Sequence, residues 1–183
     1  MYKFTQPLNP LYKTAATAVC IALCVVLPVA FHLIPNGGTL FSPMHLPVLL
    51  CGIVCGAPYG LLCGILGPLL SSLLTGMPGM GYLPPMMVEL TVYGLVAGLM
   101  MHLIHTGKQL TDIYISLIIA MLAGRILAGI SKALLFMPGE YSVQIWATSY
   151  FVSCIPAIIV QLLLIPIIYA AMQKAGLVPN RNL

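Results

Sequence analysis

Two basic side chains lie within a stretch that is otherwise apolar enough to form a membrane helix. Residues 120–136 read AMLAGRILAGISKALLF and contain Arg125 and Lys132. These two residues are seven positions apart, about two helical turns, so they project from nearly the same face of a helix. A charge inside a bilayer costs roughly 2.5–3.5 kcal/mol on insertion scales, so such residues usually face a cavity or a partner. We therefore expect this face to carry the chemistry of the protein.

A carboxylate is expected at a similar depth. Glu89 lies in the first turns of the apolar segment 85–105, and Tyr93 follows one turn deeper on the same face. Glu89 and Lys132 could form an ion pair that only steadies the helices, or both could line a cavity open to the outside. We favour the cavity, because intramembrane ionisable residues usually serve function. If Glu89 neutralises one of the two cations, Arg125 or Lys132, the other stays unpaired. An arginine is suited to bind a ligand's carboxylate with two hydrogen bonds.

Residues near the expected outer connections could complete this site. Asn36 and Tyr82 lie in two stretches that are rich in Gly and Pro. Tyr82 could cover a ligand or belong to the aromatic belt at the membrane interface, and both interpretations stay open. For Trp146 we favour the belt. His32 and His45 flank the first outer connection and are weak candidates for a ligand or metal contact.

The composition is that of a membrane protein. The chain has 183 residues, of which 61% are hydrophobic and 5% charged, and its mean hydropathy is +1.07. Soluble domains carry about 25% charged residues. We expect one integral membrane domain over residues 1–183, without a cleavable signal peptide. The net charge of +4 is scattered along the chain and does not indicate nucleic-acid binding.

The apolar runs predict an all-α protein with six transmembrane helices in a compact bundle. One ambiguous run, residues 46–74, would span about 43 Å as a single helix, against a hydrocarbon core of about 30 Å. We divide it at the sequence GAPYG, residues 56–60. The predicted segments are 11–33, 46–56, 59–74, 85–105, 113–136 and 146–172.

The basic residues predict the orientation. With an even number of crossings both termini lie on one side of the membrane, and five basic residues fall on that side. They are Lys3, Lys13, Lys108, Lys174 and Arg181. Because basic residues are enriched in cytoplasmic loops, both termini are expected in the cytoplasm, and the membrane is expected to be the cell membrane.

Catalysis finds little support in the sequence. There is no Walker A motif, no G-x-S-x-G and no H-E-x-x-H, so we expect no enzyme, no metal site and no cofactor. The pairs Cys20/Cys24 and Cys51/Cys55 are four residues apart. Their spacing would suit a thiol pair or a metal site, but apolar packing of cysteine is the interpretation we favour.

Small residues recur at helical spacing and predict close helix contacts. Gly52, Gly56, Gly60 and Gly64 form one such row. A second row lies in the first segment. Its members are Thr14, Ala15, Ala18 and Ala22. This row could serve internal packing or a docking face for another membrane protein, and the residues alone favour neither.

These features together resemble a known family. The runs SPMHLPVLLCGIVCGAPYGLLCGILGPLLSSLLTGMP, PPMMVELTVYGLVAGL and YISLIIAMLAGRI resemble the substrate-binding S components of energy-coupling factor (ECF) vitamin transporters. The resemblance implies a six-helix bundle with its site in the outer half, closed by the connections 36–44 and 75–84. It also implies docking through the Ala18 row on a transmembrane coupling subunit that carries two ATPases. The subunit itself would not hydrolyse ATP.

The expected substrate is a water-soluble vitamin or related micronutrient taken up from outside. Arg125 and Lys132 favour an anionic one, with niacin or pantothenate as the leading candidates. The start MYKFTQ lacks the leading histidine of the metal-type members. Two alternatives remain: a self-sufficient small transporter or channel, and an intramembrane thiol redox protein built on the cysteine pairs.

Overall fold

The structure is a computed structural model that describes residues 8–31, 37–136 and 141–179. These residues form helices and connections, and no strand occurs among them, which confirms the all-α prediction. The elements are α1 (Pro10–Phe31), α2 (Gly37–Phe41), α3 (His45–Cys55), α4 (Ala57–Thr75), α5 (Leu83–Leu103), α6 (Gln109–Ser131), the π-helical turn η1 (Lys132–Phe136), α7 (Val143–Ala147), the π-helical turn η2 (Thr148–Val152) and α8 (Ile155–Lys174).

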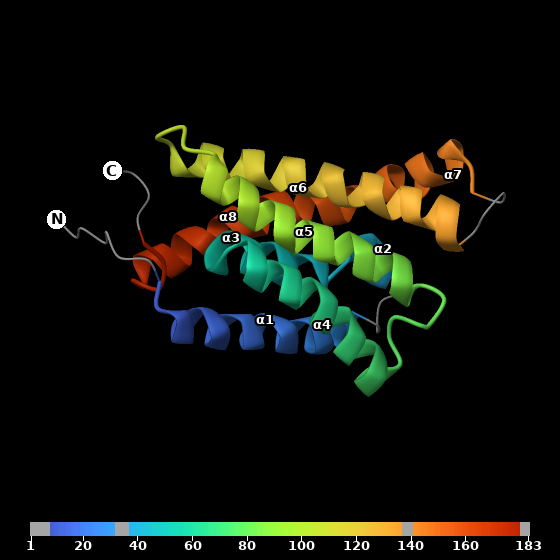
Figure 1. Ribbon diagram of the computed structural model, residues 1–183, viewed down its shortest axis with the longest axis horizontal. Coiled ribbons are helices and arrows are strands. Elements are labelled where there is room, and N and C mark those ends of the chain that lie inside the picture. The colour runs from blue at the N-terminus through green and yellow to red at the C-terminus, as the bar shows by residue number, and fades with distance from the viewer. Residues whose placement is uncertain (1–7, 32–36, 137–140, 180–183) are drawn as a thin grey trace.

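Five of the described helices are long and apolar enough to cross a membrane: α1, α4, α5, α6 with its π-helical extension, and α8. Each lies on a predicted segment. The predicted second segment corresponds to α3, which has 11 residues and is shorter than a usual span. Ten of those residues are buried, because this helix lies inside the bundle and is apolar on all sides. Figure 1 shows α3 between α1, α5 and α8.

The predicted break between the second and third segments is confirmed. Gly56 separates α3 from α4 with φ 98°, and its N–H donates to the carbonyl of Gly52. A positive φ of this size is readily adopted only by glycine. The turn reverses the chain and places α4 beside α3, and both helices pack on α5.

The close helix contacts predicted from small residues are also present. A Cβ atom added to Gly60 would overlap the backbone of Gly94, and one added to Gly94 would overlap the backbone of Gly60. Two helices can bring their backbones into direct contact only where the facing residues have no side chains. The α4–α5 contact therefore holds α5, the helix that carries Glu89, closely against α4.

Two predictions of secondary structure are wrong. Between the predicted segments 11–33 and 46–56 we expected only a connecting loop, but the short helix α2 lies there. The predicted single segment 146–172 is interrupted: α7 and η2 precede a break at 153–154, and α8 starts with Pro156 in its first turn. Proline is favoured in the first turn of a helix because its missing N–H has no partner there, so it marks a new start.

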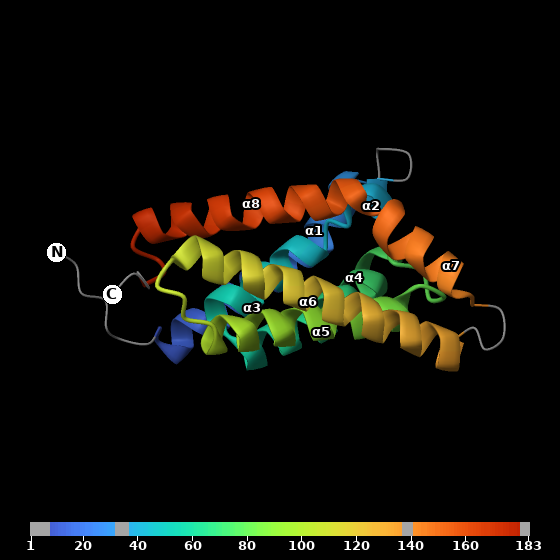
Figure 2. The ribbon, with the colours of Figure 1, turned by 90° about the horizontal axis from the view of Figure 1, so that it is seen from above.

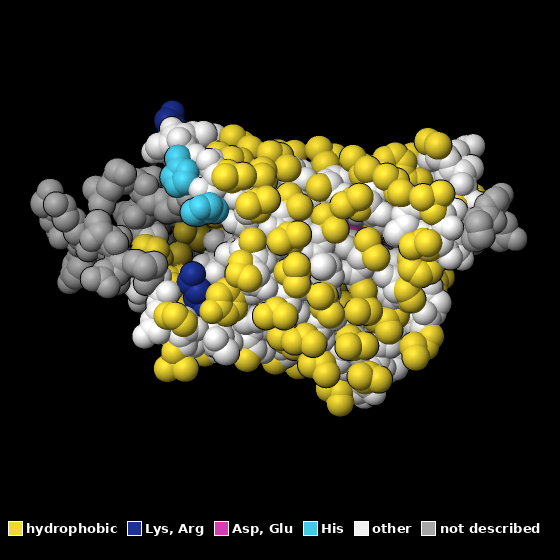
Figure 3. All heavy atoms as spheres, in the orientation of Figure 1, with side chains coloured by type: hydrophobic (Ala, Val, Ile, Leu, Met, Phe, Trp, Pro, Cys, Tyr) yellow, Lys and Arg dark blue, Asp and Glu magenta, His cyan; other side chains and the backbone are white. Residues whose placement is uncertain are grey.

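The two ends of the bundle differ. We call the end formed by the start of α1, the α3–α4 turn, the α5–α6 connection and the end of α8 the lysine end, because Lys13, Lys108 and Lys174 lie there (Figure 1). Figure 3 shows exposed basic and histidine side chains gathered at this end, whereas apolar side chains cover the middle of the molecule. The α4–α5 connection, the end of α6 and α7 lie at the opposite end. Figure 2 shows α8 along one side of the bundle, with α2 beside its start.

Candidate substrate-binding site

A cavity of about 500 Å³ lies toward the end opposite the lysine end. It is lined by residues of α1, α2, α5, α6, the start of α3, the connection 76–82 and the stretch from η2 to the start of α8. Its volume is within the range of about 300–1,000 Å³ that is usual for small-molecule sites. The ionisable side chains that line it are His45, Glu89, Tyr82, Arg125, Lys132, Tyr150 and Cys154.

Arg125 is held in place by groups on two other elements. Its side chain is on α6, is 3% exposed, and donates from Nε to the hydroxyl oxygen of Tyr93 at 2.8 Å. Its guanidinium carbon lies 5.4 Å from the ring centre of Phe151 on η2, a cation–π contact. Tyr93 can come this close because its ring packs on Gly124, where a Cβ atom would overlap it.

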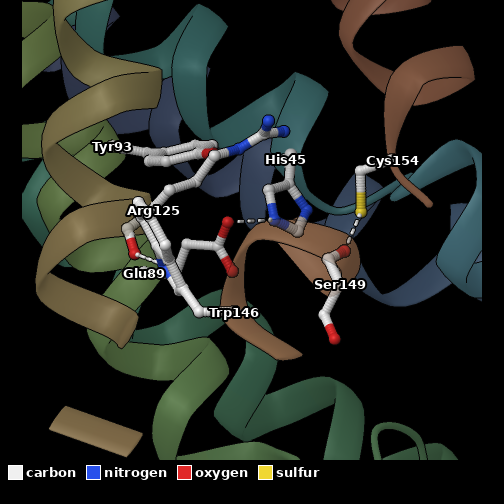
Figure 4. Close-up of polar contacts among 7 residues, drawn as sticks. All are labelled: His45, Glu89, Tyr93, Arg125, Trp146, Ser149 and Cys154. Atoms are coloured by element: carbon white, nitrogen blue, oxygen red, sulfur yellow. Dashed lines mark hydrogen bonds and ion pairs between the residues drawn. The ribbon is translucent and has the colours of Figure 1, made fainter. Parts of the chain in front are cut away.

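The guanidinium keeps donors for a ligand. Among the described residues, its hydrogen bond is the one from Nε, so the two terminal NH₂ groups retain their donors. An arginine has five N–H donors in a fixed planar arrangement, and the two NH₂ groups match the two oxygens of a carboxylate. The arrangement of Arg125, Tyr93 and Glu89 is drawn in Figure 4.

Glu89 pairs with His45 and not with Lys132. The carboxylate oxygen Oε1 lies 3.5 Å from His45 Nε2, and both side chains are more than nine-tenths buried. The His45 ring also meets Tyr93 edge-on, with ring centres 5.3 Å apart. The ion pair between Glu89 and Lys132 that the sequence allowed is therefore absent from the described part of the chain. The depth of the two residues was compatible with a pair, but His45 comes from the start of α3 and lies closer.

Lys132 lines the same cavity from the junction of α6 and η1. Its ammonium nitrogen lies 5.2 Å from the ring centre of Tyr141. Among the residues the structure describes, no carboxylate lies within ion-pair distance of it. Lys132 and Arg125 thus face the cavity together, and both contact an aromatic face.

Trp146 has a different environment from the one predicted. Its indole N–H donates to the backbone oxygen of Arg125 at 2.9 Å, and its ring packs on Gly129, where a Cβ atom would overlap it. It also meets Phe151 edge-on at 5.2 Å. Trp146 therefore links α7 to α6 and is not only an interfacial aromatic residue. In the sequence, Gly129, one turn after Arg125, is the position that leaves room for the indole ring.

The other predicted site residues are placed as follows. Tyr82 lines the cavity and is 72% exposed. Tyr93 is fully buried behind Arg125 and does not line the cavity. Asn36 and His32 lie outside the described residues. His45, a weak candidate from the sequence, lines the cavity. A histidine at the head of an apolar helix was the signal that could have found it.

The small residues of α1 face outward. Thr14, Ala15, Ala18 and Ala22 are all exposed, whereas the face toward the bundle consists of Thr17, Cys20, Cys24 and Pro28. The row therefore does not take part in internal packing within the described structure.

The cysteines pack in the interior. Five of them are buried and none of the six is in a disulfide. Cys51 donates to Thr17 Oγ1 at 3.5 Å, which links α3 to α1. No group of three or more His, Cys, Asp or Glu that could hold a metal ion occurs among the described residues. The packing interpretation accounts for these contacts.

Comparison with curated proteins and with solved structures gives no significant match. A family model described as "ECF transporter, substrate-specific component" matches residues 13–175, nearly the whole chain. Together with five helices that could cross a membrane, this identifies a multi-pass membrane protein. The chain belongs to the family of substrate-specific components of ECF transporters.

Proposed function

We propose that this protein captures an anionic, water-soluble micronutrient in the cavity around Arg125 and Lys132, and delivers it with a coupling subunit and two ATPases. Membership of the family establishes that the protein is a membrane-embedded substrate-binding subunit of an ECF transporter. The proposal adds the charge of the substrate, its site and the direction of capture.

The balance of charge in the cavity carries the proposal. Two basic side chains, Arg125 and Lys132, line the cavity together with one carboxylate, Glu89, whose Oε1 lies 3.5 Å from Nε2 of His45. Buried charges are costly unless they are paired. A ligand with a carboxylate would neutralise the surplus and use the free NH₂ groups of Arg125. The site therefore supports niacin or pantothenate, both of which carry a carboxylate.

The placement of the cavity supports capture from outside. Lys13, Lys108 and Lys174 lie at the far end of the bundle, and basic residues are enriched on the cytoplasmic side of membrane proteins. With the lysine end in the cytoplasm, the cavity lies toward the outside. The six predicted crossings, with α3 as the short one, and both termini in the cytoplasm are consistent with this orientation.

The exposed face of α1 supports docking on a partner. Thr14, Ala15, Ala18 and Ala22 present small side chains along one side of the helix. The Thr14 hydroxyl donates to the backbone oxygen of Pro10, so it satisfies its donor within the helix. A row of small residues allows another helix to approach closely in lipid. We assign this face to the transmembrane coupling subunit.

The test is a titration of the purified protein with a panel of vitamins, followed by Arg125→Ala. The matched control is Lys108→Ala, which removes an equal charge at the lysine end. The best carboxylate ligand is expected to bind at least about tenfold more weakly to Arg125→Ala, since a hydrogen-bonded charge pair contributes more than about 1.4 kcal/mol. Lys108→Ala should bind as the wild type does. Equal affinity of the wild type and Arg125→Ala would refute the proposed site.

A further inference from the structure

We propose that the substrate carries a hydroxyl group in addition to its carboxylate, and that this hydroxyl donates a hydrogen bond to Nδ1 of His45. The inference rests on the proposed function, because it concerns a second contact within the same cavity. It narrows the substrate class from carboxylic acids to hydroxy acids.

The observation behind it is an unused nitrogen. His45 is 6% exposed, and its Nδ1 is buried without a hydrogen-bond partner among the described residues. The other ring nitrogen, Nε2, faces Glu89. Figure 4 shows the ring between Glu89 and the turn that carries Ser149 and Cys154, with its second nitrogen directed toward that turn. All four residues line the cavity.

The neighbouring protein groups do not supply the missing hydrogen bond. The Cys154 thiol donates to the backbone oxygen of Ser149 at 3.2 Å. Tyr93 presents its ring edge-on to His45 and accepts from Arg125 through its hydroxyl. A buried polar atom without a partner is costly, so the arrangement favours a ligand that brings one.

The tautomer of His45 decides what kind of group fits. A carboxylate only accepts hydrogen bonds, so Nε2 must carry the proton that faces Glu89. In the neutral ring Nδ1 is then an acceptor. A ligand group that pairs with Nδ1 must then be a donor.

A hydroxyl is the donor that fits best. It is the smallest donor available, and its hydrogen rotates to meet an acceptor. Arg125 lies on α6 and His45 at the start of α3, so the two contacts come from different walls of the cavity. A ligand that reaches both needs its carboxylate and its hydroxyl at separate positions. Pantothenate has both groups, whereas the second polar atom of nicotinate is a ring nitrogen that only accepts.

The experiment compares three ligands on the purified wild-type protein: pantothenate, N-(3,3-dimethylbutanoyl)-β-alanine, which lacks both hydroxyls, and nicotinate. Pantothenate is expected to bind about tenfold or more tightly than either of the others, the effect of one well-made buried hydrogen bond. This comparison needs no variant, so it does not depend on the folding of a mutant. Equal binding of pantothenate and the hydroxyl-free analogue, or tighter binding of nicotinate, overturns the inference.

Two variants then assign the effect to His45. His45→Leu removes Nδ1 and should reduce the preference for pantothenate over the analogue to about twofold or less. His45→Asn places an amide oxygen near the position of Nδ1 and should retain most of the preference. An unchanged preference in His45→Leu overturns the inference. Arg125→Ala separates the two proposals: if it abolishes binding of all three acids but hydroxyls have no effect, only the hydroxyl contact is wrong. If it changes none of them, the proposed carboxylate site is wrong.

Discussion

The hydrogen bond between Tyr93 and Arg125 gives the sharpest test of how the site is built. Tyr93→Phe removes one oxygen atom from a fully buried ring and leaves its packing on Gly124 intact. The bond is 2.8 Å long, and its donor is a charged group that is 3% exposed. Hydrogen bonds to charged groups contribute about 1.5–3 kcal/mol.

Most of this loss should appear in the stability of the protein. Tyr93 does not line the cavity, so Tyr93→Phe removes no contact with a ligand. The Nε donor of Arg125 loses its partner in the free and in the bound protein alike. We expect the free energy of unfolding to fall by about 1.5–3 kcal/mol, which lowers Tm by about 3–12 °C in a chain of this size. The affinity for the ligand should weaken only if the loss of this hydrogen bond lets the Arg125 side chain move.

The assay is a double-mutant cycle on thermal unfolding in detergent, with Tyr93→Phe, Arg125→Ala and the two combined. If the bond is as described, the two changes are not additive, and the coupling energy is about 1 kcal/mol or more. Additive effects within about 0.5 kcal/mol would show that the two residues do not interact, and would refute the account of how Arg125 is positioned.

Three further predictions concern the scaffold. Ala18→Trp should leave vitamin binding intact but abolish co-purification with a coupling subunit, whereas Ile118→Trp, on an exposed face of α6, should do neither. Gly94→Ala should force α4 and α5 apart and destabilise the protein by about 1–3 kcal/mol in an unfolding titration, whereas Gly81→Ala, which has no atom within 4 Å of its Cβ, should have little effect. Trp146→Phe should lower the free energy of unfolding by about 0.5–1.5 kcal/mol, because it removes the indole hydrogen bond to the backbone of α6.

The sequence predicted the helices well because membrane helices are specified by hydropathy and length. The break at Gly56 was visible, since a single helix over 46–74 would be longer than the bilayer is thick. The short helix α2 was missed because five residues give no periodicity to detect. The interruption before α8 was missed although Pro156 marked it, because the run remains apolar on both sides of the break.

Several of the predicted site residues lie close together in the structure, whereas the contacts between them could not be predicted. Arg125, Lys132, Glu89 and Tyr82 were selected as charged or aromatic residues at suitable depth, and the structure brings all four to one cavity. Their roles toward a ligand remain predictions. Depth along the membrane normal is one coordinate, and it does not say how a helix is rotated. For this reason the sequence left open whether Glu89 pairs with Lys132, and in the structure the side chain within ion-pair distance of Glu89 is His45.

Charge selection is the central claim, and the most direct measurement compares acids with their neutral counterparts on the unmodified protein. The fluorescence of the single tryptophan, Trp146, which is hydrogen-bonded to the backbone of Arg125, offers a readout in titrations with pantothenate and pantothenol, or nicotinate and nicotinamide. In at least one pair the acid should bind about tenfold or more tightly than the neutral compound, because only the acid neutralises the surplus charge of Arg125 and Lys132. Tighter or equal binding of the neutral member in every pair would contradict the account.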